Sequence, residues 1–382
     1  MNLVYAYPWD IVGDPAAPER LAALGVDAVA LAASYHSTRA ATPLHPAHRV
    51  LDVPHSAFYL PVRAEAWGRL VPAAPTWTTP DAYLLASDAL RAAGLKVYAW
   101  TVLTHNAHLG QAHPDLVVRN AFGDRYPYAL CPAWEDVADY CERLVREVLT
   151  AGEPDGLILE GCGPMGFGHQ SVHEKTAGAD FDAGLMSLCF CARCADLYPA
   201  GTGDRVRAAI DSPVAPGGTG SKPGGTGASV LEAALGPLAD EVRAVRVELS
   251  AALRRRLTST ARQVAPNLPI ALHADPDPWA TGPFSALPEG ERAADVLVGN
   301  CWGDPDKDAA RLSRLGELCG PGQRVGAYVL ALPPRPADAE ALAELLSTYV
   351  KAGASEIHLY HAGLASPQRW AAMKDALRIA GR

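Results

Sequence analysis

The chain has 382 residues, of which 49% are hydrophobic and 20% are charged, so it can bury a large core without disulfides. Its formal net charge of -9 and its lack of basic runs argue against a surface that binds nucleic acid or an anionic membrane. It has neither an apolar run of membrane-spanning length nor a secretion signal at its start, so we expect a cytoplasmic protein.

Eight apolar runs of strand length alternate with helix-like or turn-rich segments along the chain. The runs cover residues 3–7, 28–35, 96–104, 156–162, 269–274, 296–302, 324–332 and 357–361. Amphipathic segments include residues 18–24, 81–93, 133–149, 230–264, 306–318 and 337–352. Gly25, Gly94 and Gly353 follow three of these segments, which is typical of a helix C-terminus. The alternation predicts an α/β fold, a (β/α)8 TIM barrel formed by residues 1–382 as a single domain.

A doubly wound open sheet is the second possibility, but no Gly-x-Gly-x-x-Gly motif follows the first run.

Two segments fall outside the repeat. Residues 34–80 are rich in His, Pro and Arg, and they predict a long functional loop after the second strand, at the top face of the barrel. Residues 199–228 are rich in Gly and Pro, and they predict a flexible insertion without chemistry.

Three closely spaced thiols, Cys189, Cys191 and Cys194, favour a metal over disulfides in a protein of this type. Structural zinc needs four donors, and the best remaining candidate is Cys131, which precedes a proline. We therefore predict that these four cysteines hold a structural zinc that staples the loop after the fourth strand. The alternative is a set of buried thiols without a metal.

Catalytic groups of such barrels lie at the C-terminal ends of the strands. The polar and aromatic residues that we expect to contact a substrate there are Trp9, Asp10, His36, His105, Asn106, His169, His173, Glu174, His273, Trp279, Asn300, Trp302 and His361. Tryptophan rings can stack on the apolar face of a sugar. The set therefore suits a small carbohydrate or glycoside.

Glu160 ends the fourth apolar run, which places a carboxylate at the top of the predicted barrel. We predict a catalytic role for it; the structural alternative is a salt bridge with Arg125 or Lys175. Asp304 and Asp275 are the candidates for a second catalytic carboxylate. Each of these two could instead cap the helix or turn that follows it.

A rival chemistry depends on histidines at the strand ends. The residues that could form an oxygen- and nitrogen-ligated metal centre are His105, His273, Asp275, His358 and His361. His169 and His173 have the helical spacing of a metal pair, yet the His-Glu-x-x-His order is absent. A hydrolase or lyase that uses such a centre is one alternative function.

The segment from about residue 120 to 195 resembles the family 42 β-galactosidases and related barrel glycoside hydrolases. The motifs that carry the resemblance are Cys131-Pro132, a helix at 135–148, a strand at 156–160 and Cys189-x-Cys191-x-x-Cys194. Residues 120–126 and 173–175 also resemble uncharacterised barrel proteins described as hypothetical glycoside hydrolases. The resemblance implies that Cys131, Cys189, Cys191 and Cys194 bind zinc and that Glu160 is the acid/base.

Two positions depart from this family. Leu159 stands where the family has Asn, and residues 328–332 lack the Glu that serves as its nucleophile. The second carboxylate is therefore assigned to Asp304 first and to Asp275 second. We predict a glycoside hydrolase-like enzyme that cleaves the glycosidic bond of a sugar or sugar-bearing small molecule by carboxylate acid/base catalysis. A non-catalytic carbohydrate-binding barrel is a further alternative, and a homo-oligomer is left open.

Overall fold

A computed structural model describes residues 1–169, 176, 178, 181–212, 228–287 and 294–381. Among them, eight parallel strands form the barrel: β1 (Asn2–Ala6), β2 (Ala28–Tyr35), β6 (Lys96–Val102), β9 (Gly156–Glu160), β10 (Ile270–Asp275), β12 (Val296–Cys301), β13 (Arg324–Leu330) and β14 (Ala354–Tyr360). The strand order is β1-β14-β13-β12-β10-β9-β6-β2, and pairing of β1 with β2 closes the ring. The predicted (β/α)8 barrel is confirmed.

Helices flank this barrel: α1 (Ala17–Ala22), α2 (Ala82–Ala92), α4 (Glu135–Gly152), α10 (Ala239–Val264), α11 (Pro305–Leu318), α12 (Ala339–Lys351) and α13 (Pro367–Ala380). Gly25, Gly94 and Gly353 follow α1, α2 and α12 with φ values of 79°, 83° and 106°, as the sequence predicts. Between β10 and β12 the described residues contain no helix, only the short strand β11 (Ser285–Ala286), which pairs with β10.

The connection after β2 is folded rather than a plain loop. It contains the antiparallel pair β3 (Thr38–Ala41) and β4 (Val50–Val53), and then β5 (Ala57–Phe58), which pairs with the end of β2. The 3-10 helices η1 (Pro8–Asp10) and η2 (Ala64–Ala66) lie at the end of β1 and in this connection. The predicted long segment after the second strand is therefore present, and it folds into a small unit of short strands and a 3-10 helix.

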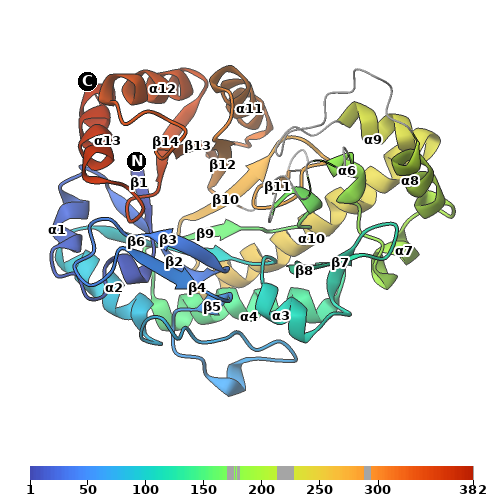
Figure 1. The fold of residues 1–382 in the computed structure, drawn as a ribbon, viewed down its shortest axis with the longest axis horizontal. Helices are drawn as coiled ribbons and strands as arrows, with labels where there is room; N and C mark the ends of the chain where they lie inside the picture. Colours follow the sequence, from blue (N-terminus) through green and yellow to red (C-terminus); the bar gives the residue numbers. More distant parts are fainter. Residues whose placement is uncertain (170–175, 177, 179–180, 213–227, 288–293, 382) are drawn as a thin grey trace.

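A second hydrophobic core lies beside the barrel core. Its elements come mainly from the connections that follow β6 and β9: β7 (Val117–Arg119), β8 (Arg125–Leu130), η3 (Phe167–His169), α6 (Ala183–Met186), α7 (Ala192–Leu197), α8 (Thr202–Asp211), α9 (Ala228–Leu235) and η4 (Gly236–Leu238). The connection after β6 also contains α3 (Ala107–Ala112), whose Leu109 belongs to the barrel core. Buried residues of this second core include Tyr126, Cys131, Leu188, Val206 and Trp279. In Figure 1, α6 to α9 lie at the opposite end of the molecule from α13.

The second core changes the interpretation of residues 199–228. Within that range α8 is helical, and Val206 is fully buried among the second core's apolar side chains. The first part of the expected flexible insertion is thus folded. Residues 213–227 lie outside the described part of the chain.

The barrel interior contains aromatic rings where branched aliphatic side chains are more usual. The ring of Tyr5 packs edge-on against Trp100 and Tyr328, with centroids 4.9 and 4.8 Å away. The ring of Tyr98 lies against Gly156, where an added Cβ would come within 2.2 Å of it, so only glycine fits there. Of these rings, Trp100 and Tyr5 contact Glu160 and His273 near the C-terminal ends of the strands, a region termed the barrel mouth below. Tyr98 lies lower, in register with the first residue of β9.

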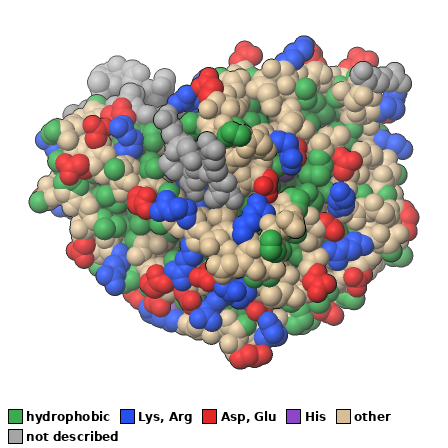
Figure 2. All heavy atoms as spheres, turned by 180° about the vertical axis from the view of Figure 1, so that it is seen from behind, with side chains coloured by type: hydrophobic (Ala, Val, Ile, Leu, Met, Phe, Trp, Pro, Cys, Tyr) green, Lys and Arg blue, Asp and Glu red, His purple; other side chains and the backbone are tan. Residues whose placement is uncertain are grey.

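The visible surface mixes charges of both signs. Figure 2 shows Lys and Arg side chains interspersed with Asp and Glu over one face, without a basic patch. No helix among the described residues is both long and apolar enough to span a membrane.

Candidate active site

Glu160 is the last residue of β9, and its side chain is almost completely buried at the barrel mouth. The indole Nε1 of Trp100 donates a hydrogen bond to its Oε2 at 2.6 Å, and Nδ1 of His273 lies 3.4 Å from the same oxygen. Burial raises the pKa of Glu160 to about 7, although the bond from Trp100 opposes the rise. This carboxyl can therefore hold a proton near neutral pH.

A hydrogen-bonded chain of polar residues, termed the interior chain, continues from His273 into the barrel. The hydroxyl of Tyr5 lies 2.9 Å from Nε2 of His273 and 3.3 Å from Nδ1 of His358. Nε2 of His358 lies 3.4 Å from Glu356, which pairs with Arg324 at 2.9 Å. Arg324 begins β13, so the interior chain links the barrel mouth to the N-terminal ends of the strands.

Asp10 is a second buried carboxyl at the barrel mouth. Its Oδ2 accepts a hydrogen bond of 2.8 Å from the backbone N–H of Tyr7 and lies 3.9 Å from Nδ1 of His361. Burial raises its pKa to about 7. A Cβ at Gly363 would come within 1.9 Å of the Asp10 carboxylate, so the glycine makes room for this side chain.

Aromatic rings at the mouth form a partly open platform. The ring of Trp302 stacks on Tyr328 with an interplanar angle of 13° and lies 4.7 Å from the ring of Tyr360. Trp302 is 38% exposed, whereas Trp9 is only 1% exposed. Among the predicted tryptophans, Trp302 is therefore the one placed to meet a ligand.

The predicted second carboxylates have different environments. Asp304 is exposed and caps α11, since its side chain accepts from the N–H groups of Asp306 and Lys307 at 3.2 Å. Asp275 ends β10, is 19% exposed and pairs with Nε of Arg311 at 3.2 Å. Burial raises the pKa of Asp275 despite that partner.

Other predicted contact residues have structural partners. Asn106 caps α3 by accepting from the N–H of Leu109 at 3.0 Å, and Trp279 lies in the second core with its Nε1 3.3 Å from Glu232. Asn300 is half-buried near the end of β12. His173 and Glu174 lie outside the described residues.

The histidines do not gather into the predicted His/Asp centre within the described part of the chain. His273 and His358 bond to Tyr5, and His361 lies beside Asp10. His105 instead joins His36 and His169, a histidine cluster whose ligand atoms lie within 4.8 Å of one another. Sequence spacing could not show this cluster, because its members come from the connections after three different strands.

The four predicted cysteines converge in the second core. All are buried, and Sγ of Cys131 lies 3.5, 3.8 and 3.7 Å from Sγ of Cys194, Cys189 and Cys191. Four sulfurs about 2.3 Å from one tetrahedral zinc would be about 3.8 Å apart, which matches these spacings. This cysteine cluster therefore fits a metal ion.

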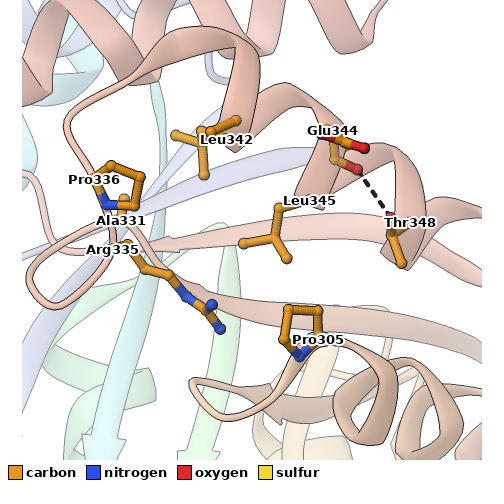
Figure 3. Close-up of a pocket in the computed structure, with 9 residues that line it drawn as sticks. Pro305, Ala331, Arg335, Pro336, Leu342, Glu344, Leu345 and Thr348 are labelled. Carbon is orange, nitrogen blue, oxygen red and sulfur yellow. Dashed lines mark hydrogen bonds between the residues drawn. The ribbon is translucent and has the colours of Figure 1, made fainter.

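A cavity of about 310 Å³ lies between α12 and the turn after β13 (Figure 3). Its lining residues are Pro305, Ala331, Arg335, Pro336, Ala341, Leu342, Glu344, Leu345 and Thr348. A smaller cavity of about 20 Å³ adjoins Asp10. Glu160 lines neither of these two cavities, and Leu342 and Leu345 make the larger one mainly apolar.

Trp100, Tyr5 and Gly363 are site components that were not predicted from the sequence. Strand alternation carried the signal for Trp100, because Tyr98, Trp100 and Val102 point to one side of β6. Val102 is the register partner of Glu160, so Trp100 lies one layer below that carboxyl.

No protein-family model matches the chain, and a search of curated proteins finds no match. Solved structures match its fold. An α-L-fucosidase (isoenzyme 2) from Paenibacillus thiaminolyticus aligns with a TM-score of 0.56 and 11% identity over 99% of this chain and 49% of its own. The β-galactosidase from the psychrophilic Marinomonas ef1 aligns with a TM-score of 0.55 and 13% identity over 100% of this chain and 59% of its own.

A β-galactosidase from Bacillus circulans sp. alkalophilus aligns with a TM-score of 0.51 and 12% identity over 94% of this chain and 50% of its own. The chain thus spans 49 to 59% of the length of these three proteins. At such identities the likeness shows a common fold.

Proposed function

We propose that this protein is a glycoside hydrolase-like enzyme that cleaves a glycosidic bond of a sugar or sugar-bearing small molecule, with Glu160 as the proton donor. The observation that carries the proposal is the buried carboxyl of Glu160, which has a pKa of about 7, at the C-terminal end of a barrel strand. A general acid needs a pKa near the working pH, and burial is the usual way to give a glutamate that property.

The aromatic platform supports a carbohydrate as the substrate. The exposed ring of Trp302, supported from below by the buried ring of Tyr328, offers a face at the mouth beside the half-buried Tyr360, and sugar C–H groups pack well on such faces. Three solved proteins of the same fold are named as a fucosidase and β-galactosidases, which favours the same class of chemistry here.

We assign the complementary carboxylate to Asp275 ahead of Asp304. Asp275 follows His273 by two residues on β10, so the two side chains point to the same side of the strand. His273 contacts Glu160, so Asp275 lies on the side of β10 that faces this carboxyl. The carboxylate of Asp304 is exposed and engaged by two N–H groups at the start of α11. In this assignment Glu160 protonates the leaving oxygen, and Asp275 acts as the nucleophile or activates water.

The cysteine cluster has a structural role in this proposal. Cys131 follows β8, whereas Cys189, Cys191 and Cys194 lie in the connection after β9. Four thiolates fill the coordination sphere of a zinc ion and leave no position for a substrate. A zinc ion held there would instead link the two connections that carry the cysteines.

The test is release of aglycone from a panel of aryl α- and β-glycosides by wild type, Glu160→Gln and Asp275→Asn at equal zinc content. Loss of a general acid lowers turnover by on the order of a hundredfold or more, and we expect this for Glu160→Gln. We expect a comparable loss for Asp275→Asn.

Two control variants are Glu65→Gln, which removes an exposed carboxylate, and Asp304→Asn, which tests the competing assignment. Full turnover by Glu160→Gln would overturn the role of Glu160. A large loss in Asp304→Asn with none in Asp275→Asn would reverse the assignment of the second carboxylate.

A further inference from the structure

We propose that the histidine cluster, formed by His36, His105 and His169, binds one divalent transition-metal ion, separately from the cysteine cluster. The inference goes beyond the proposed glycosidase function and does not depend on it. The three imidazoles come from the end of β2, from the segment after β6 and from η3. They offer one nitrogen each, and these nitrogens lie within 4.8 Å of one another.

The ring contacts show how the three imidazoles converge. Nε2 of His169 lies 3.0 Å from Nδ1 of His105, with the two rings at 81°. The ring of His36 stacks on His105 with centroids 4.1 Å apart. Three nitrogens about 2.1 Å from one tetrahedral ion would be about 3.4 Å apart, so small ring movements would bring them to one ion.

The protonation state of His36 is suited to metal binding. Its Nδ1 lies 2.8 Å from the carbonyl oxygen of Ser37, which can only accept, so Nδ1 carries the hydrogen. Nε2 of His36 therefore keeps a free lone pair. Histidine ligands of metals commonly donate their other N–H to a backbone carbonyl in this way, which fixes the ring and its tautomer.

His105 supplies a second, independent indication. It is 4% exposed, and its Nε2 has no hydrogen-bond partner among the described residues. Buried imidazole nitrogens without a partner are costly, and because Nδ1 of His105 already faces His169, a metal ion at this cluster would relieve that cost by contacting Nε2.

Neighbouring contacts hold the segment that carries His169. The hydroxyl of Tyr128 donates to the carbonyl of Gly166 at 2.7 Å, and the N–H of Phe167 donates to Ser187 at 2.9 Å. The position of His169 is therefore set by packing against the second core. A fixed ligand position lowers the entropy lost when a metal binds.

The ligand set determines the class of ion. Imidazole nitrogens without thiolates or carboxylates suit Zn²⁺, Co²⁺, Ni²⁺ and Cu²⁺ better than Mg²⁺ or Ca²⁺. Three protein ligands leave a coordination position for water or a hydroxyl. Two aromatic rings lie between the histidine cluster and Glu160. The ring centroid of Tyr35 is 4.1 Å from that of His36 and 4.6 Å from that of Trp100, and Trp100 donates a hydrogen bond to Glu160.

The test uses the full chain with zinc retained at the cysteine cluster and Co²⁺ as the probe. We expect wild type to bind one further equivalent of Co²⁺, with visible d–d absorption and without the near-ultraviolet charge-transfer band of cobalt thiolates. His169→Gln and His36→Gln, which alter half-buried residues, should each weaken this binding by at least about tenfold, while the exposed control His108→Gln should not.

Three results would overturn the proposal: no Co²⁺ binding by folded wild type, equal binding by the cluster variants, or a cobalt-thiolate band that accompanies the binding. Zinc content and thermal melting of each variant show that its fold and its cysteine cluster are intact. Because the readout is metal binding, the result is independent of whether the protein cleaves glycosides.

Discussion

Replacing Glu160 by glutamine should stabilise the protein more at pH 8 than at pH 5. The unfolded chain ionises this carboxyl near its ordinary pKa of 4.5, whereas the folded protein holds the proton up to about pH 7. A group with a raised folded pKa contributes stability below its unfolded pKa, and that contribution is lost as the pH rises through the folded pKa. Glutamine does not ionise, so the variant avoids this loss.

The size of the effect follows from the two pKa values. A tenfold change in proton affinity is worth about 1.4 kcal/mol, so ionising Glu160 costs about 3 kcal/mol of folding free energy at pH 8 and less than about 1 kcal/mol at pH 5. The stability difference between Glu160→Gln and wild type should therefore grow by about 2.5 kcal/mol from pH 5 to pH 8. Asp10 is present in both proteins, so its titration cancels in the comparison.

Urea unfolding at the two pH values measures this difference without any substrate. Glu65→Gln is the matched control, because it removes an exposed carboxyl, and its difference from wild type should stay within about 0.5 kcal/mol at both pH values. A Glu160→Gln difference that is the same at pH 5 and pH 8 would refute the argument that burial keeps this carboxyl protonated.

Gly363→Ala should destabilise the protein by about 1–3 kcal/mol in urea unfolding, because the new methyl group would overlap Asp10; Gly168→Ala, where a Cβ meets nothing within 4 Å, should not. Cys194→Ser should weaken zinc retention by at least about a hundredfold in a chelator competition and lower the melting temperature; unchanged zinc content would contradict a four-thiolate site. Tyr5→Phe keeps the ring but removes the hydroxyl of the interior chain, so we expect a loss of about 1–3 kcal/mol, whereas an unchanged urea midpoint would show that the chain adds nothing to stability.

Local sequence patterns predicted the barrel strands well, since both faces of a parallel strand are buried and leave continuous apolar runs. The last strand shows the limit of this signal. It begins at Ala354, three residues before the predicted run, because Ser355 and Glu356 interrupt the apolar pattern. Glu356 is nevertheless buried, since Arg324 and His358 pair with it. Such compensation is invisible in a single segment of sequence.

The candidate site was predictable where chemistry imposes a spacing and unpredictable where the fold alone brings residues together. The cysteine cluster belongs to the first kind, because three of its ligands lie within six residues. The contact between Asp10 and Gly363 belongs to the second, because the residues lie at opposite ends of the chain. The same reason hid the meeting of Tyr5 with His273 and His358.

Closure of the barrel also constrains how the chain folds during synthesis. β1 pairs with β14, where Leu3 is in register with His358. One edge of β1 therefore stays unpaired until residues 354–360 have been synthesised and have left the ribosome. Until then the edges of β1 and β13 expose unpaired N–H and C=O groups, which are prone to join other chains. The protein is therefore most vulnerable to aggregation as a nascent chain, and a C-terminal truncation before β14 should make that state permanent.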